Sequence, residues 1–172
     1  IKVTNQTSLK SVALLENGQV DLIVINYPNS NLSNLYSIKK INQFQDLFVA
    51  NHNYSQLKDR KVSLKELSQY PILMLEREST TSEFLHNLFQ QNQLDLVPEI
   101  ELSSNDLLCD LAKIGLGIAF IPDYCIPEHN DDLFFVDIKE NLPSRELAIV
   151  HNNHIPTSKV VQEFLALFQE PL

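Results

Sequence analysis

Residues 111–122 read LAKIGLGIAFIP, and they carry the clearest signal of fold in the chain. The segment begins as the end of an apolar-faced helix. Gly115 then suits the left-handed residue that commonly closes a helix. The apolar run 118–121 is stopped by Pro122, and a short continuous run of this kind is typical of a strand buried on both faces of a mainly parallel sheet. The stretch predicts one helix-to-strand step of an α/β fold.

The same step recurs along the chain. Residues 7–17 predict a helix closed by Gly18, and the apolar run at 21–25 predicts a strand buried on both faces. Residues 26–33 predict a loop, because they are rich in Asn, Ser and Pro. Two capping boxes, Ser63 to Glu66 and Thr80 to Glu83, each predict a helix start. The remaining predicted elements are strands at 36–42, 46–51, 71–75, 98–102, 118–122, 133–138 and 146–151, a helix at 105–114, and a final helix capped by Thr157. This alternation predicts an α/β fold without a flexible linker.

Composition excludes several classes of protein. Thirteen Lys and Arg face 22 Asp and Glu, so the formal net charge is −9 and the chain itself is not expected to contact nucleic acid. No apolar stretch approaches the roughly 20 residues that cross a bilayer, and no signal peptide is visible. We therefore expect a cytoplasmic protein that does not bind membranes. Its strand-like start without an initiator Met indicates a fragment of a longer protein. The two cysteines suit a reducing compartment. Cys109 is predicted to be a buried free thiol, and a disulfide to Cys125 stays open.

Five segments, in this order, resemble one family. They are NGQVDLIV at 17–24, DLFVANH at 46–52, the helix and proline at 64–71, ESTT at 78–81, and SSN at 103–105 followed by residues 111–122. Together they are similar to the effector (inducer)-binding domain of LysR-type transcriptional regulators. Relative to that family, the chain lacks the N-terminal helix-turn-helix and the first strand and helix of the domain.

The resemblance implies a two-lobed fold like the type 2 periplasmic binding proteins, with mixed, mainly parallel sheets. Lobe I would comprise residues 1–46 and 145–172, and lobe II residues 47–144. A small anionic or polar organic effector would bind in the cleft between the lobes. The domain would form a homodimer or homotetramer. Its interface would account for the apolar faces of helices 7–17 and 105–114, and packing in the core accounts for them equally well. DNA would be contacted only through the absent domain.

Loops at the carboxyl ends of strands are the expected binding region, because ligands of open α/β sheets bind there. Hydroxyl side chains and unpaired N–H groups at a helix start suit a carboxylate or similar anion. The predicted effector-binding residues are Asn26, Tyr27, Ser79, Thr80, Thr81, Ser104 and Asn105. The alternative is that Thr80 and Ser104 only cap their helices. Arg77 is expected to make a surface ion pair rather than to bind the effector.

Neither a catalytic set nor a cofactor motif emerges, so no enzyme activity and no cofactor are predicted. The pair His151 and His154 invites a metal site, but Asn152, Asn153 and Pro156 favour a solvated loop. Two alternatives to the sensor share its scaffold. They are a solute-binding protein of an importer and an enzyme similar to a prephenate dehydratase domain.

Overall fold

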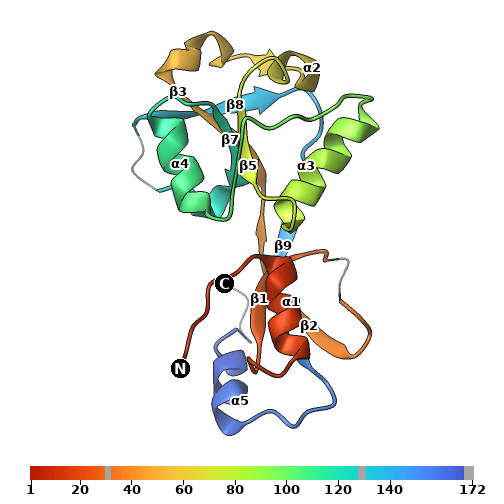
Figure 1. Ribbon diagram of the computed structural model, residues 1–172. Coiled ribbons are helices and arrows are strands. Elements are labelled where there is room, and N and C mark those ends of the chain that lie inside the picture. The colour runs from red at the N-terminus through yellow and green to blue at the C-terminus, as the bar shows by residue number, and fades with distance from the viewer. Residues whose placement is uncertain (30–31, 128–130, 169–172) are drawn as a thin grey trace. The chain divides into compact units, whose positions relative to one another are not determined.

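The computed structural model describes residues 1–29, 32–127 and 131–168 (Figure 1). The chain forms two compact units. Unit 1 contains residues 1–43 and 145–172, and unit 2 contains residues 44–144. Helices and mixed sheets confirm the predicted α/β class. No helix in the described ranges is long and apolar enough to cross a membrane. The functional lobe boundaries at residues 46 and 145 stay a prediction.

Unit 2 is built on a six-stranded sheet. Its strand order is β4-β8-β3-β7-β5-β6. Pairing is parallel for β5 with β6, β5 with β7 and β4 with β8, and antiparallel for β3 with β7 and β8. The strands are β3 Asp46–Asn51, β4 Lys61–Val62, β5 Ile72–Leu75, β6 Ile100–Leu102, β7 Ile118–Pro122 and β8 Leu133–Ile138. Helix α3 (Thr80–Gln91) connects β5 to β6, and helix α4 (Asn105–Lys113) connects β6 to β7.

Both faces of this sheet are covered. Successive side chains of a strand point to opposite faces, so Phe48 and Phe120 lie on one face and Val49 and Ala119 on the other. The first face packs against the apolar side of α3, and the second against the apolar side of α4 (Figure 1). The two cores explain the apolar residues of the two helices: Leu85, Leu88 and Phe89 on α3, and Leu108, Cys109 and Ala112 on α4.

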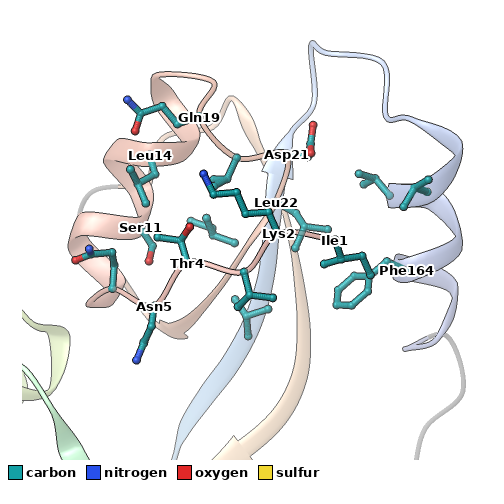
Figure 2. A pocket seen from close by; sticks show the side chains of 17 residues that line it. Ile1, Lys2, Thr4, Asn5, Ser11, Leu14, Gln19, Asp21, Leu22 and Phe164 are labelled. Carbon is teal, nitrogen blue, oxygen red and sulfur yellow. The ribbon is translucent and has the colours of Figure 1, made fainter.

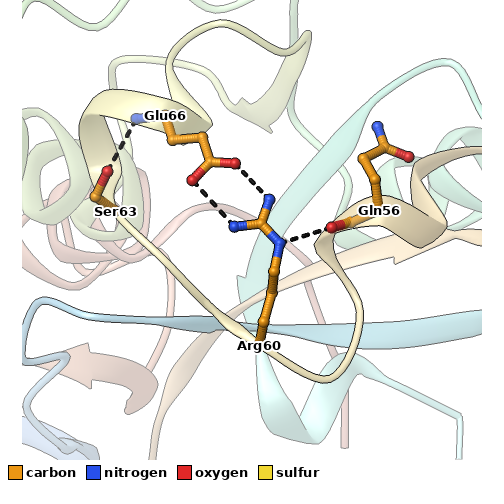
Figure 3. Close-up of polar contacts among 4 residues, drawn as sticks. All are labelled: Gln56, Arg60, Ser63 and Glu66. Carbon is orange, nitrogen blue, oxygen red and sulfur yellow. Dashed lines mark hydrogen bonds and ion pairs between the residues drawn. The ribbon is translucent and has the colours of Figure 1, made fainter.

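Hydrogen bonds from the exposed Arg60 stabilise the segment between β3 and β5. This segment contains the 3-10 helix η1 (His52–Leu57) and the short helix α2 (Leu64–Leu67). Arg60 Nε donates to the carbonyl of Gln56 at 2.7 Å, while both terminal nitrogens of Arg60 contact the carboxylate of Glu66 (Figure 3). The Ser63 hydroxyl caps α2 by accepting from the N–H of Glu66 at 3.2 Å. Half of the predicted capping box is therefore present, because Glu66 binds Arg60.

Unit 1 is a three-stranded sheet in the order β1-β9-β2, accompanied by two helices. Its elements are α1 Ser8–Glu16, β1 Ile23–Tyr27, β2 Tyr36–Phe44, β9 Arg145–Asn152 and α5 Lys159–Ala166. Side chains of α1 pack on one face of the sheet, where Val12 and Leu15 meet Ile23 and Ile25. Gly18 (φ +64°) follows α1, as predicted.

Two predictions about residues 21–33 are wrong, and both concern strand β1. It pairs antiparallel with β9, and Val24 is 44% exposed, so β1 is not buried on both faces of a parallel sheet. It also extends to Tyr27, because Asn26 and Tyr27 pair with Leu147 and Glu146 of β9. The predicted loop therefore starts two residues later than expected.

Two caps lie one residue away from their predicted positions. Helix α3 is capped by Ser79, not Thr80, and α5 by Ser158, not Thr157. In each case the neighbouring hydroxyl adopts the extended backbone conformation that a cap requires. Ser104 does cap α4, and Gly115 (φ +81°) follows that helix as predicted.

Candidate functional site

The start of α3 buries four consecutive hydroxyl side chains. Ser79, Thr80, Thr81 and Ser82 are each at most 5% exposed. The Ser79 hydroxyl accepts from the N–H of Ser82 at 3.1 Å, and the Ser79 carbonyl accepts from the N–H of Glu83 at 3.0 Å. The first N–H groups of a helix have no intrahelical acceptor. Here they are surrounded by side chains that can also hydrogen-bond.

Two polar atoms of α3 are buried without a partner. These are Ser82 Oγ and His86 Nε2, and neither has a hydrogen bond within the described part of the chain. Residues four apart are neighbours on one helix face, so the imidazole lies one turn beyond the hydroxyl. Buried polar atoms are nearly always satisfied, and a missing partner is often a ligand, ion or water. This pair therefore marks a candidate ligand contact.

The start of α4 lies at the same edge of the unit 2 sheet as the start of α3. Strands β5 and β6 are parallel neighbours with Leu75 opposite Leu102, and the N–H of Glu76 donates to the carbonyl of Leu102 at 2.8 Å. The Ser104 hydroxyl accepts from the N–H of Leu107 at 3.4 Å. Asn105 Oδ1 is a third buried polar atom without a partner in the described chain.

Electrostatics at this edge come from the helix ends. Each helix N-terminus carries a partial positive charge equivalent to roughly half an elementary charge, and two of them lie here. Glu83 and Asp106, in the first turns of α3 and α4, are exposed and thus screened by solvent. Arg77 is also exposed. The arrangement can bind a small anion or a hydroxyl-rich molecule through N–H, hydroxyl, amide and imidazole groups.

Asn26 and Tyr27 lie in unit 1, in the last part of β1. The N–H of Asn26 donates to Ser8 Oγ at 3.0 Å, and the Asn26 side chain is buried. The Lys40 ammonium lies 5.4 Å from the Tyr27 ring centroid and 2.7 Å from Glu146 Oε2. Five of the seven predicted residues, Ser79, Thr80, Thr81, Ser104 and Asn105, therefore lie at one edge of the unit 2 sheet. The other two, Asn26 and Tyr27, lie in unit 1.

Sequence reasoning missed Ser82 and His86. Their spacing of four was visible in the sequence, but spacing does not reveal whether a polar atom is buried or satisfied. Ser82 also lies within the predicted capping box, which explains a serine in the first turn without any ligand. Only the folded environment separates them from ordinary helix-surface residues.

The histidine and cysteine side chains of the described ranges do not converge on a metal site. Within the described residues, no group of three His, Cys, Asp or Glu side chains is arranged to hold a metal ion. His151 lies in β9 rather than in the predicted loop, whereas His154 lies in the following turn. Cys109 is a buried free thiol, as predicted, and Cys125 is also free. Burial raises the pKa of both thiols, to about 12 for Cys125.

Comparison with known proteins assigns the family. Residues 1–172 match the family model of the LysR substrate binding domain. The chain is 28% identical over 153 residues to the HTH-type transcriptional activator CmpR of Synechocystis sp., which corresponds to 88% of this chain and 50% of CmpR. The chain belongs to the LysR substrate binding domain family. It spans about half the length of the curated relative that it matches.

Solved structures show the same fold. The Synechocystis CcmR regulatory domain in complex with 2-PG has a TM-score of 0.83 and 18% identity, over 95% of this chain and 81% of that chain. The effector binding domain of QuiR in complex with shikimate has a TM-score of 0.80 and 14% identity, over 93% and 75%. The apo regulatory domain of HypT from Salmonella typhimurium has a TM-score of 0.77 and 20% identity, over 98% and 80%. These LysR regulatory domains have the periplasmic-binding-protein-like, two-lobed fold.

Proposed function

We propose that this LysR-type effector-binding domain recognises a small anionic or polar organic molecule at the starts of α3 and α4. The carrying observation is a set of three buried polar atoms that have no partner among the described residues, Ser82 Oγ, His86 Nε2 and Asn105 Oδ1. A ligand that accepts from an N–H and also donates to an oxygen would satisfy all of them. The ligands of the CcmR and QuiR domains, 2-phosphoglycolate and shikimate, combine an acidic group with further oxygen atoms. They supply the first probes.

The family match favours a transcription regulator over the importer and enzyme alternatives. In the longer protein, effector binding would shift the equilibrium between conformational states and thereby alter the affinity of a helix-turn-helix domain for DNA. That domain, not this acidic chain, would contact DNA in the cytoplasm. A ligand acts in this way only through its different affinity for the two states.

We also propose that copies of the domain associate through α4. Leu107 is exposed on this helix, Ile114 is exposed at its C-cap, and Leu111 is partly buried. Their spacing of four and three residues forms one stripe along the helix. The other side of α4 packs on the sheet of unit 2. A self-complementary contact between two such stripes is the simplest symmetric way to cover them.

Ligand binding is tested by thermal shift and calorimetry on this chain. The probes are 2-phosphoglycolate, shikimate and inorganic phosphate, with sodium chloride as the ionic-strength control. A true ligand raises the melting temperature in a saturable way. Ser82→Ala and Asn105→Ala should each weaken binding about tenfold or more, since a hydrogen bond to a charged group contributes about 1.5–3 kcal/mol.

The Ser82→Ala variant is informative because the Ser82 hydroxyl has no partner in the described part of the ligand-free chain. The melting temperature of the ligand-free variant should therefore equal or exceed that of the original chain. Asn87→Ala, at an exposed position of α3, is the matched control and should bind normally. Unchanged affinity in Ser82→Ala, Asn105→Ala and Thr80→Ala would exclude the site. Asn26→Ala and Tyr27→Phe test separately whether unit 1 contributes.

A further inference from the structure

The turn after α1 contains Asn17-Gly18, the one asparagine–glycine pair in the sequence. An asparagine side chain can react with the backbone nitrogen of the next residue, and glycine obstructs that attack least because it has no side chain. Both residues are exposed. No described atom beyond its chain neighbours lies within 4 Å of a Cβ built on Gly18. Packing therefore does not shield the two reacting groups from each other or from water.

The closed turn holds the Gly18 nitrogen away from the Asn17 side chain. The N–H of Gly18 donates to the carbonyl of Leu15 at 3.1 Å, and the N–H of Gln19 donates to the carbonyl of Leu14 at 2.9 Å. These two bonds form a Schellman motif, and Figure 2 shows Leu14 in α1 and Gln19 beyond the end of the helix. Because ψ of Asn17 is 3°, the Gly18 nitrogen eclipses the Asn17 nitrogen and not the side chain. Attack therefore requires the turn to open.

The end of α1 is anchored by one apolar side chain and weakened by one charge. Leu15 is 3% exposed and packs in the core of unit 1. Glu16 adds a negative charge at the helix C-terminus, where the partial charge is also negative, and the last turn contains no basic residue. Terminal turns of helices open locally at less cost than the whole structure. The open turn is therefore a minor state of the folded chain.

We propose that Asn17 is a site of spontaneous deamidation and that opening of the turn after α1 controls its rate. In the open turn the Gly18 nitrogen bonds to Cγ of Asn17, the bond from Cγ to Nδ2 breaks, and ammonia leaves with the proton of the Gly18 N–H. Water then opens the cyclic imide. Cleavage at Cγ gives aspartate, whereas cleavage at the main-chain carbonyl carbon gives isoaspartate. Neither step transfers electrons.

Both products weaken the connection from α1 to β1. Each places a carboxylate at the negative end of α1, where an anion is unfavourable. Isoaspartate also adds one methylene group to the main chain between Leu15 and Gly18, so the spacing of the Schellman bonds is lost. Helix α1 packs on the sheet of unit 1 directly before β1 begins. Modified chains should therefore melt at a lower temperature than unmodified chains.

Peptide mass spectrometry tests the proposal on the chain incubated at pH 8, folded and unfolded in urea. Deamidation at Asn17 should be at least about tenfold slower in the folded chain. Hydrogen exchange at the Gly18 amide is measured on the same folded sample. Both reactions require the bond from Gly18 to Leu15 to break, and opening is fast relative to deamidation, so both should be slowed by a similar factor.

Two helix variants locate the opening. Ala13→Gly, at an exposed position of α1, weakens the helix and keeps the Asn17-Gly18 pair, so it should speed deamidation about two- to fivefold. Ala166→Gly, at the exposed end of α5, is the matched control and should leave the rate unchanged. Equal rates in the folded and the unfolded chain would overturn the proposal. So would an unmodified Asn17 in urea, or an Ala13→Gly variant whose Gly18 amide exchanges faster without faster deamidation.

Discussion

At the scale of single residues, Gly115 is a position where an added methyl group should be costly. Its φ of +81° is left-handed, and a Cβ there would contact Asn53 Nδ2 and lie 2.8 Å from Asn51 Nδ2. Asn51 Nδ2 donates to the Lys113 carbonyl at 2.9 Å, so the methyl group would also displace a bond that secures the end of α4. We expect Gly115→Ala to lower the free energy of unfolding by about 2–4 kcal/mol.

Gly18 is the matched control for this prediction. It shares the left-handed conformation (φ +64°), but no atom lies within 4 Å of an added Cβ. Gly18→Ala should lower the free energy of unfolding by about 1–2 kcal/mol, because only the strain of a left-handed alanine opposes folding. Urea unfolding followed by circular dichroism measures both variants, and equal losses would show that crowding at Gly115 is unimportant.

Cys125 gives a prediction about pH. Burial, assisted by Asp106, Asp46 and Asp123, raises the pKa of its thiol to about 12. The thiolate is the reactive form, so at pH 8 only about one molecule in ten thousand is reactive, and the fraction rises about tenfold per pH unit up to pH 11. In the unfolded chain the thiol titrates near pH 8.5 and its reactivity levels off above that value.

Alkylation of the Cys109→Ser variant isolates this thiol. Iodoacetamide incorporation, measured by mass spectrometry from pH 7 to pH 11, should climb steadily in the folded protein and reach a plateau after unfolding in urea. Folded protein that reacts at pH 8 as fast as unfolded protein would contradict the buried environment. A thiol so rarely ionised is a poor redox sensor.

At the scale of elements, the contact between Arg60 and Glu66 should make the η1–α2 segment sensitive to acid. Hydrogen bonding to the Arg60 guanidinium lowers the pKa of the Glu66 carboxyl below its ordinary 4.5. The folded state therefore binds fewer protons than the unfolded state, and stability is lost as pH falls. The contribution is complete above about pH 5 and disappears below the lowered pKa.

Arg60→Gln should remove this acid-sensitive part of stability. The difference in melting temperature between the original chain and the variant should be largest at pH 6 and should shrink as the pH falls below 4.5, the ordinary pKa of the carboxyl. Lys159→Gln is the control, because Lys159 Nζ lies 3.9 Å from Glu163 Oε1 in a more exposed pair. A difference for Arg60→Gln that stays constant with pH would show that the arginine acts through packing alone.

Elements were predictable from sequence where a single strong pattern specifies them. The apolar run 118–121 followed by Pro122, and Gly115 after α4, define their elements without further information. The edge position of β1 was not predictable. Ile23, Val24 and Ile25 are all apolar, and the sequence of a strand does not specify which strands pair with it. Adjacent hydroxyls, as at Ser79 and Thr80, also left each cap uncertain by one residue.

The location of the candidate site was predictable from the sequence, but two of its residues were not. The rule that ligands bind at the carboxyl ends of parallel strands selected the starts of α3 and α4, and β5 and β6 are indeed parallel neighbours. Ser82 and His86 required knowledge of burial and of missing partners, which depends on residues distant in sequence. Whether Asn26 and Tyr27 act with this site stays a prediction.

At the scale of the whole molecule, the stripe on α4 predicts self-association. Ile114 is 68% exposed and Leu107 46% exposed, which is costly for two large apolar side chains on one helix face. The stripe is flanked by Asp110 and Lys113, whose charged groups lie 3.5 Å apart. Apolar centres with charged borders are typical of protein interfaces, so we expect this chain to dimerise through α4.

Ile114→Lys tests that expectation, with Phe135→Lys as its matched control. Each substitution places a charge at an exposed apolar position of unit 2, since Phe135 is 59% exposed on β8. In a symmetric dimer one substitution acts twice, so Ile114→Lys should raise the Kd of the dimer at least about tenfold. Phe135→Lys should leave it unchanged. Sedimentation equilibrium over a range of concentrations measures both. A dimer that persists in Ile114→Lys but dissociates in Phe135→Lys would place the interface at β8. If the original chain is a monomer at every concentration, the predicted dimer does not form.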